Sequence, residues 1–376
     1  MKLEILTTNL KKALNNTERL TKKSLSLPVL QNVLLETDKN FLKIISTDLE
    51  TSIIYWVLAK IEKEGKVIVP ASILNNLISL ITEDKIILKV ENKNLILETK
   101  TQNNQIQGID PEEYPILPKI EEENTITVNG EQLSQGLGQV IGVPNFSQIR
   151  PEISGVYFSF KKNTIKIVGT DSFRLAEKTV HLEDKLKKEG SFILPQATGR
   201  ELLNILTQEP QEVKLYFDPK QIMFEWFSAE TSHPYIRLLS RVIEGDYPNY
   251  QEIIPKKYTT ELILSREDFL LQIKKAGIFS GKVSEVKLTP LLKENKIKIF
   301  SQSPELGKNE SILEAKINGE ESASEASFNY KFLIDGLQNI RSSEVVLKLS
   351  NEEGPGVLSG VGDSSYIYIL MPIKAN

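Results

Sequence analysis

The sequence contains no cysteine and only two histidines among its 376 residues. The absence of cysteine excludes disulfides, thiolate chemistry and zinc sites built on cysteine. His181 and His233 lie far apart in the sequence, so a histidine metal cluster or a histidine-based acid–base site is not expected. Together with the carboxylates considered below, this scarcity leads us to expect no metal, no cofactor and no catalytic residue.

Long apolar runs are also missing. No stretch approaches the roughly 20 apolar residues that a membrane-spanning helix needs, and Met1 leads directly into an alternating strand. With 40% hydrophobic and 26% charged residues, the composition is that of an ordinary globular protein. The expected location is the cytoplasm.

The chain has little net charge of either sign. A formal charge of −4 argues against a protein coated in basic residues. It does not argue against a basic stripe on an acidic protein, because the field near a surface depends on the local arrangement of charges. The net charge alone does not decide whether the protein binds nucleic acid.

The most informative feature is an internal repeat. A pattern recurs without a gap at an offset of 123 residues, which carries Pro28, Asn40 and Thr47 to Pro151, Asn163 and Thr170. A third, more diverged copy follows, in which residues 295–299 repeat the strand motif of residues 40–44. A period near 120 residues is that of a whole domain. We expect three domains, at residues 1–120, 121–256 and 257–376.

Each copy reads as a strand-rich α+β unit with two helices. Every copy opens with a short strand and a helix; Thr7 or Thr8 is the expected N-cap of the first, and residues 265–268 form a capping-box pattern in the third. A second helix follows Pro70 in the first copy, with Ile73, Leu77, Leu80 and Ile81 as its apolar positions. Acidic, proline-containing segments at residues 110–118 and 245–255 are expected to be stiff extended connectors between the domains.

Two carboxylates allow a catalytic or metal-binding reading. Asp48 and Asp171 occupy matching positions after a strand, where a carboxylate can bind a metal ion or act as a base. The third copy has no carboxylate in the corresponding stretch, residues 301–303, and no glycine-rich phosphate loop or histidine converges on either aspartate. The pattern therefore favours a structural role, in which Asp48 and Asp171 each close a turn, over a catalytic or metal-binding one.

The second copy differs from the first at one informative place. Phe173 and Arg174 stand where the first copy has Glu50 and Thr51, so this copy has gained an aromatic ring and a cation. Two interpretations remain open from the residues alone: ordinary strand packing, or a recognition pocket.

Five motifs in this order resemble the bacterial DNA polymerase III β subunit, the sliding clamp family. They are residues 27–32 (LPVLQN), 47–50 (TDLE), 169–176 (GTDSFRLA), 245–250 (GDYPNY) and 371–374 (MPIK). The resemblance runs from end to end and includes the length and the threefold repetition. It implies the DNA clamp fold and a head-to-tail homodimer, a ring of six similar domains with helices lining the hole. Such a ring would encircle double-stranded DNA without reading its sequence and act as a processivity factor for the replicative polymerase.

The resemblance also implies a pocket for short peptides of the DNA polymerase III catalytic subunit, the clamp loader and other proteins with a clamp-binding motif. Phe173 stands where the family commonly has a histidine, and the chain continues for three residues after Ile373. The family's pocket residues correspond here to Ile153, Thr170, Ser172, Phe173, Arg174, Leu175, Pro248, Ile253, Asn329, Phe332, Ile369, Met371, Pro372 and Ile373.

A basic lining of the hole would follow from the same resemblance. Ser24 stands where a basic residue is common, with two lysines directly before it. The candidates for DNA contact are Lys11, Lys12, Arg19, Lys22, Lys23, Arg200, Lys274, Lys275, Lys331 and Arg341.

Two alternatives from other classes remain. One is a metal-dependent nuclease or hydrolase on a repeated scaffold, with Asp48 and Asp171 as ligands; turnover that depends on a divalent metal would support it. The other is a monomeric three-domain interaction scaffold that never closes into a ring. The mass in solution separates the second from a clamp.

Overall fold

The computed structural model describes residues 1–21, 27–118, 120, 125–183, 186, 188–228, 233–319, 325–350 and 354–373. Contacts group the chain into two compact units. The first contains Met1–Ser134 and Ala197–Val242, and the second contains Gln135–Gln196 and Ile243–Asn376. The elements of the central repeat are thus shared between the two units. The expected domain boundaries at residues 120 and 256 stay predictions.

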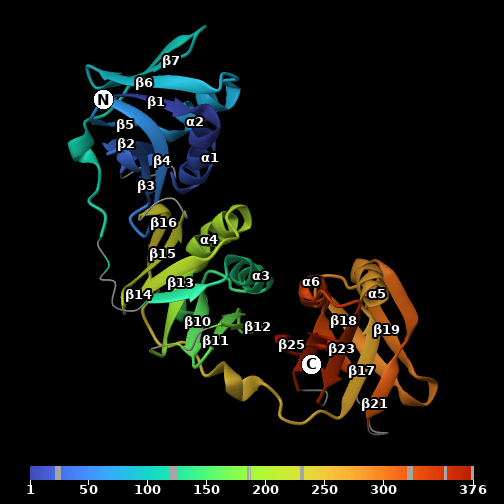
Figure 1. Cartoon of the computed structure of the whole chain (residues 1–376). Helices are drawn as coiled ribbons and strands as arrows, with labels where there is room; N and C mark the ends of the chain where they lie inside the picture. The colour runs from blue at the N-terminus through green and yellow to red at the C-terminus, as the bar shows by residue number, and fades with distance from the viewer. Residues whose placement is uncertain are drawn as a thin grey trace. The chain divides into compact units, whose positions relative to one another are not determined.

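The three repeats share one order of elements: strand, helix, four strands, helix, three strands (Figure 1). The first repeat has β1 (Lys2–Leu6), α1 (Thr7–Thr17), β2 (Asn32–Asp38), β3 (Phe41–Thr47), β4 (Thr51–Lys63), β5 (Lys66–Pro70), α2 (Ala71–Leu80), β6 (Lys85–Glu91), β7 (Asn94–Glu98) and β8 (Asn103–Ile106). The second has β9 (Thr125–Val128), α3 (Gly130–Val140), β10 (Gly155–Lys161), β11 (Thr164–Thr170), β12 (Arg174–His181), β13 (Gly190–Pro195), α4 (Gln196–Gln208), β14 (Val213–Phe217), β15 (Gln221–Phe227) and β16 (Pro234–Arg241).

The third repeat follows the same order with one short extra strand, β21. Its elements are β17 (Thr260–Ser265), α5 (Arg266–Ile278), β18 (Glu285–Leu291), β19 (Lys296–Ser303), β20 (Gly307–Glu314), β21 (Lys316–Gly319), β22 (Ala326–Asn329), α6 (Tyr330–Asn339), β23 (Glu344–Leu349), β24 (Gly356–Gly360) and β25 (Asp363–Leu370). The expectation of three tandem, two-helix, sheet-rich α+β domains is confirmed.

Antiparallel strands join neighbouring repeats into continuous sheets. In the first unit, β4 of the first repeat pairs with β16 of the second, with Leu238 opposite Ile53. In the second unit, β12 of the second repeat pairs with β25 of the third, with Ala176 opposite Tyr368. The first sheet runs β8-β7-β6-β1-β4-β16-β15-β14-β9, and the two sheets of the second unit run β13-β10-β11-β12-β25-β24-β23-β17-β21 and β20-β19-β18-β22. Strands β8 and β20 are therefore sheet edges among the described residues.

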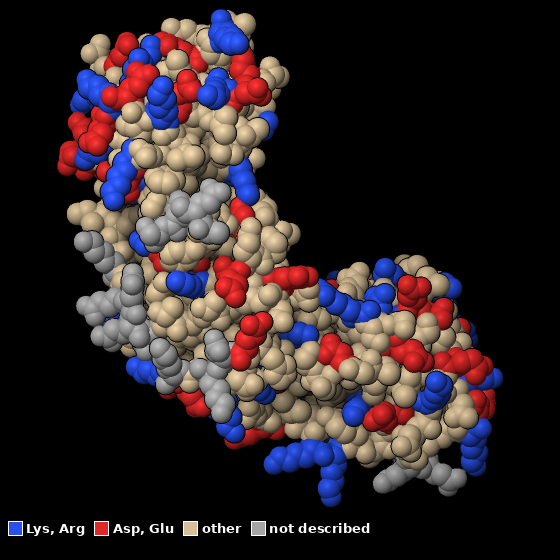
Figure 2. All heavy atoms as spheres, viewed as in Figure 1, with Lys and Arg blue, Asp and Glu red and all other residues tan. Residues whose placement is uncertain are grey.

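The surface carries charges of both signs. Lysine and arginine are interspersed with aspartate and glutamate over the face shown in Figure 2. Among the described residues, no helix combines the length and the apolar character needed to cross a membrane. Because charges are mixed in this view, a basic binding surface has to be sought residue by residue.

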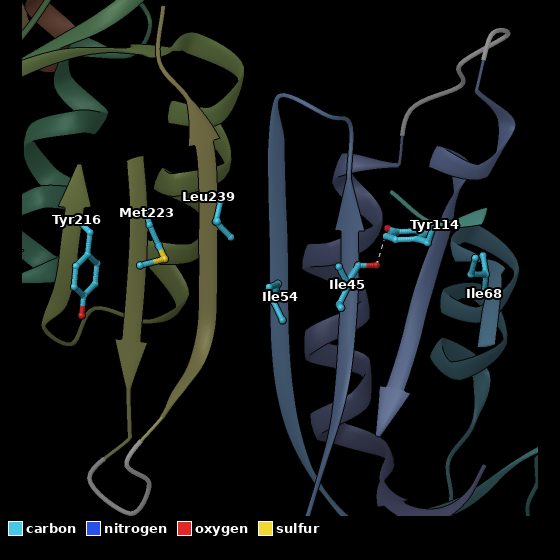
Figure 3. Close-up of a cluster of buried hydrophobic side chains, with 7 residues drawn as sticks. All are labelled: Ile45, Ile54, Ile68, Tyr114, Tyr216, Met223 and Leu239. Carbon is cyan, nitrogen blue, oxygen red and sulfur yellow. Dashed lines mark hydrogen bonds between the residues drawn. The ribbon is translucent and has the colours of Figure 1, made fainter. Parts of the chain in front are cut away.

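Both connectors dock on their own repeat before they leave it. The N–H of Ile109 donates to the carbonyl of Ile68 at 2.9 Å, and Ile243 does the same to Ile193 at 2.9 Å. In the first repeat, the Tyr114 hydroxyl then donates to the carbonyl of Ile45 at 3.0 Å (Figure 3). Each expected extended connector contains a short 3₁₀ turn, Pro111–Glu113 or Tyr250–Ile253, so neither is extended along its whole length. The buried cluster around Tyr114 comprises Ile45, Ile54, Ile68, Tyr216, Met223 and Leu239.

The helix ends show where local sequence signals were sufficient. Ser265 is the N-cap of α5 and accepts a hydrogen bond from the N–H of Asp268, as the capping pattern predicts. The N-cap of α1 is Leu6, not a threonine, because the Thr7 hydroxyl donates to the carbonyl of Glu83 at 2.6 Å. The tertiary partner of Thr7 thus replaces the local cap.

Helix α2 buries only some of the expected apolar positions: Ile81, directly after its end, is buried, and Leu77 is half-buried. Leu74 and Ile78 are fully buried, whereas Ile73 and Leu80 are 53% and 79% exposed. The helix carries two apolar stripes, and its periodicity alone does not tell which of them faces the core. The exposed stripe on α2 needs another explanation.

Candidate functional site

The two Thr-Asp turns have the same geometry. Residues Leu49 and Ser172 adopt a left-handed backbone conformation, with φ of 74° and 76°. The Thr170 hydroxyl donates to the carbonyl of Arg174 at 2.8 Å, as the Thr47 hydroxyl does to Thr51 at 3.0 Å. This turn places Arg174 at the first position of β12.

The carboxylates of the same turns are committed to hydrogen bonds with the backbone. Asp48 Oδ1 accepts from the N–H groups of residues 50 and 51, and Asp171 Oδ1 accepts from those of Phe173 and Arg174. Within the part of the chain that the structure describes, no group of three or more His, Cys, Asp or Glu side chains is arranged to hold a metal ion. The geometry favours the interpretation of Asp48 and Asp171 as turn residues.

A cavity of about 210 Å³ lies beside the second turn. One wall of the cavity comes from the turn and β12, with Thr170, Ser172 and Leu175. A second wall comes from the connector between the second and third repeats. Two residues of the third repeat, Ile369 and Met371, line it from β25 and the segment after it. The remaining residues that line it are Arg150, Ile153, Arg174, Pro248, Asn249, Tyr250 and Ile253. We call it the anchor cavity.

Tyr250 holds the connector wall of this cavity in place. Its hydroxyl donates to Glu177 Oε2 at 2.5 Å, and Lys166 Nζ contacts Glu177 Oε1 at 2.8 Å. Burial raises the pKa of Tyr250, and the hydrogen bond to Glu177 raises it further, so the phenol stays protonated and keeps donating. The wall is therefore fixed before any ligand arrives.

Arg174 is held by partners on three elements. Its Nε donates to Asp171 Oδ2 at 3.0 Å, and its Nη1 contacts Asp335 on α6 and the Tyr368 hydroxyl on β25. The guanidinium also stacks on the ring of Phe332, 4.5 Å from its centroid. Burial opposes the charged form of Arg174, but Tyr368, Asp335 and Asp171 outweigh it and raise the pKa, so the residue stays charged. Arg174 packs in the strand junction and also lines the cavity; its part in a recognition pocket stays a prediction.

A close approach of α6 to β25 supports this cluster. A Cβ placed on Gly336 would lie 2.5 Å from Cδ1 of Tyr368, which is far inside a normal contact. Only glycine at this position lets the helix lie directly against the Tyr368 ring. The partner of Arg174 on α6, Asp335, is the neighbouring residue.

The other expected pocket residues are not among those that line the anchor cavity. Phe173 is exposed on the turn, and its carbonyl accepts from the N–H of Met371 at 2.9 Å. Asn329 is the N-cap of α6. Pro372 and Ile373 follow Met371, and the N–H of Ile373 donates to the carbonyl of Ser327 at 2.8 Å. This bond matches those of Ile109 and Ile243, so the segment after β25 starts like a connector.

Sequence reasoning missed Arg150, Asn249 and Tyr250. Asn249 and Tyr250 belong to the GDYPNY motif, which supports the expected connector and the family resemblance but does not by itself mark these two residues as pocket lining. Arg150 precedes the Pro151 that opens a 3₁₀ turn, Pro151–Ile153, and its ion pair with Glu152 is local. The first connector also carries a tyrosine that bonds to its own repeat, but the Tyr114 hydroxyl donates to a backbone carbonyl, whereas that of Tyr250 donates to a carboxylate.

Two of the expected DNA-contacting residues already have carboxylate partners. Lys12 forms an ion pair with Glu209, and Arg19 Nε contacts Glu201 Oε2 on α4 at 3.1 Å. Lys11 donates to the carbonyl of Ser79 at 2.9 Å. Lys12 on α1 and Arg19 in the 3₁₀ turn after it thus connect the first repeat to α4 and the residue that follows α4 in the second. Part of their charge is balanced within the chain.

The remaining basic candidates are exposed. Arg200 lies on α4, and both Lys274 and Lys275 lie on α5. Lys331 lies at the start of α6, and Arg341 follows its end. Two further candidates, Lys22 and Lys23, and the neighbouring Ser24 fall outside the described residues.

Comparisons with known proteins agree with this architecture. Models of the N-terminal, central and C-terminal domains of the DNA polymerase III beta subunit match residues 1–118, 127–249 and 251–374. A curated relative, the beta sliding clamp of Synechococcus elongatus, is 25% identical over 354 residues and 92% of each chain. That of Bacillus subtilis is 26% identical, over 84% of this chain and 82% of its own.

Solved structures have the same fold over the full length of both chains. The DNA polymerase III beta subunit of Thermotoga maritima superposes with a TM-score of 0.91 at 24% identity and full coverage of both chains. The sliding clamp of Pseudomonas aeruginosa bound to griselimycin gives a TM-score of 0.93 at 21% identity, again with full coverage. The family models together span nearly the whole sequence. The chain therefore belongs to the DNA polymerase III beta subunit family, the family of the beta sliding clamps.

Proposed function

We propose that the protein works as a DNA sliding clamp in the cytoplasm: a homodimeric ring that encircles duplex DNA and tethers the replicative polymerase, without chemistry of its own. The observation that carries this proposal is the repeated junction between repeats. In each junction, the third strand after the first helix of one repeat pairs with the last strand of the next repeat. These pairs are β4 with β16 and β12 with β25. Strand β20 has the place in the third repeat that β4 and β12 have in the first two, and β8 is the last strand of the first repeat. Both β20 and β8 are sheet edges among the described residues.

A second chain can supply the missing partners. If β20 of one protomer pairs with β8 of its partner, the third junction repeats the two internal ones. Two chains then provide two such contacts, and six repeats close into a ring. Closure also covers two strand edges in each chain, β8 and β20, which otherwise invite unspecific pairing.

The helices lead to the same pairing. Within the first unit, Asn16 on α1 exchanges hydrogen bonds with Gln208 on α4, and within the second unit Gln139 on α3 donates to the carbonyl of Asn339 on α6. In each case the first helix of one repeat meets the second helix of the next. The rule predicts that α5 meets α2 of the partner.

Both of these helices expose apolar side chains. On α5, Leu271 and Ile278 are 49% and 66% exposed, and on α2 Ile73 and Leu80 form the exposed stripe described above. Large exposed apolar side chains in such a stripe are typical of an interface. The pairing of α5 with the partner's α2 gives the stripe on α2 its explanation.

DNA and partner proteins would use different parts of this ring. Exposed cations on the helices, among them Arg200, Lys274 and Lys275, would contact phosphates without reading bases. The anchor cavity, with aliphatic walls and Met371, would take apolar side chains from peptides of the DNA polymerase III catalytic subunit, the clamp loader and other proteins with a clamp-binding motif.

Mass in solution and retention on DNA test the proposal. Two chains of 42.5 kDa give 2 × 42.5 = 85 kDa, and a mass of 42.5 kDa would instead support a monomeric scaffold. Once loaded, the ring should stay on nicked circular DNA and slide off the same DNA after linearisation. Equal retention on both forms would contradict the topological mechanism, and metal-dependent DNA cleavage would support a nuclease.

A further inference from the structure

Two cavities lie along the connector between the second and third repeats. One is the anchor cavity. The other, of about 280 Å³, is lined by Tyr157, Ser159 and Lys161 of β10, by Thr164 and Lys166 of β11, and by connector residues 247–251. Both cavities share Pro248, Asn249 and Tyr250 as a common wall. We call the second one the lysine cavity.

The floor of the lysine cavity is one face of two paired strands. Ser159 lies opposite Lys166, and Lys161 lies opposite Thr164. Alternate residues of a strand point to the same side, so these four side chains share the face with Tyr157. The floor is thus part of the sheet and has a defined geometry.

The wall that both cavities share is rigid. The rings of Tyr157 and Tyr247 stack with centroids 4.5 Å apart and planes 7° from parallel. Beside them, Tyr250 is fixed by its hydrogen bond to Glu177. A ligand that reaches across the wall meets two sites whose spacing is set in advance, which lowers the entropic cost of binding both.

The lysine cavity carries an excess of positive charge. Lys166 is balanced by the buried carboxylate of Glu177, which also accepts from Tyr250. Lys161 is exposed, and none of the described residues forms an ion pair with it. One connector acid beside the cavity, Glu252, is held by the Asn249 amide at 2.7 Å. A carboxylate ligand would therefore find an uncompensated ammonium group at Lys161.

We propose that the lysine cavity binds an acidic residue that flanks the apolar anchors of a partner peptide, with Lys161 as its main contact. The proposal rests on the proposed function of the anchor cavity, and its two supports are continuity across the shared wall and charge complementarity. The apolar anchors of the peptide would enter the anchor cavity. The acidic residues beside them would cross Pro248 and enter the lysine cavity. Affinity would then depend on residues outside the apolar motif.

Fluorescence anisotropy with three labelled peptides tests the proposal on the full-length dimer. The first peptide carries leucine and phenylalanine anchors in an uncharged context, and the other two add three glutamates before or after the anchors. One of the two extensions should strengthen binding to the wild type about threefold to fivefold at low salt, the gain typical of one or two exposed ion pairs. The gain should shrink as salt is added.

Variants locate the contact. Lys161→Gln should remove the gain and leave the uncharged peptide's affinity unchanged, whereas Lys161→Arg should keep the gain. Lys220→Gln is the matched control, because Lys220 is an exposed lysine in the turn between β14 and β15. If neither extension strengthens binding, or if Lys161→Gln keeps the gain, the lysine cavity is not the acidic subsite, while the anchor cavity stands.

Two further outcomes separate this proposal from others. If the uncharged peptide itself fails to bind the wild type, the peptide function of the anchor cavity fails and the acidic subsite fails with it. If Lys161→Gln weakens binding of a labelled DNA duplex and not of the extended peptide, the cavity is a phosphate site and the proposal is overturned.

Discussion

Arg174 on β12 is ion-paired with Asp335 on α6. Its side chain is only 9% exposed and also contacts Asp171 and the ring of Phe332. The arginine therefore connects the second repeat to the third while it lines the anchor cavity. One substitution of Arg174 changes both peptide binding and folding stability. A second variant is therefore needed to tell the two effects apart.

Replacement of Arg174 by alanine should lower both the peptide affinity and the free energy of unfolding. Peptide affinity should fall about thirtyfold, because truncation of a residue in a desolvated pocket typically costs about 2 kcal/mol or more. The free energy of unfolding should also fall by about 2 kcal/mol, since Asp171 loses a charged hydrogen-bond partner. Peptide titration and urea denaturation measure the two effects.

Asp335→Asn is the matched control for this variant. It removes one charge from the cluster but leaves Arg174 paired with Asp171, so it should cost less stability and less affinity than Arg174→Ala. The dimer mass should stay unchanged in both. Full peptide affinity in Arg174→Ala would place the partner site elsewhere.

Deletion of residues 371–376 should abolish stimulation of the polymerase and leave the dimer intact. The deletion removes Met371 from the cavity lining and the backbone bond from Met371 to Phe173. Met371→Ala keeps that backbone bond and should show a smaller loss, which separates the side chain from the chain segment. Processive synthesis on primed circular DNA gives the readout, and normal stimulation by the deletion variant would exclude this segment from the partner site.

The sequence predicted the architecture because the repeat is long and its local signals agree with each other. The order of elements in three copies and the cap at Ser265 could be read from patterns alone. The buried face of α2 could not, because Ile73 and Leu80 form a second apolar stripe that the periodicity does not distinguish from the buried one. Thr7 failed as a cap for a similar reason, since its partner Glu83 lies 76 residues away.

The candidate site was predictable where it follows the turn and less so elsewhere. The Thr170–Arg174 turn repeats that of the first copy, so its geometry follows from the motif. Asp335 and Glu177 carry no local signal; only the fold brings them to Arg174 and Tyr250. The residues that hold a pocket in shape are therefore harder to find in a sequence than those that form its walls.

A charge placed in the exposed stripes should separate the protomers. Ile278→Lys on α5, or Leu80→Glu on α2, would place a charge where an apolar contact is proposed, at a cost of at least about 2 kcal/mol in each of two junctions. Light scattering should show the mass falling from that of two chains to 42.5 kDa. Leu58→Glu is the control, because Leu58 is 62% exposed on β4, outside both helices. A dimer that survives both stripe variants would refute the proposed contact.

The basic residues should divide into two classes by their salt dependence. Arg200 is exposed, and none of the described residues pairs with it, so Arg200→Ala should reduce the slope of log K against log salt for duplex binding by about 0.9 per lost phosphate contact. Lys12→Ala should leave the slope nearly unchanged, because Lys12 is already paired with Glu209. It should instead lower the free energy of unfolding by about 1 kcal/mol, the upper range for a half-exposed pair. Duplex titrations at several salt concentrations, with Lys220→Ala as control, separate the classes; an equal loss of slope in Lys12→Ala would assign Lys12 to the DNA surface.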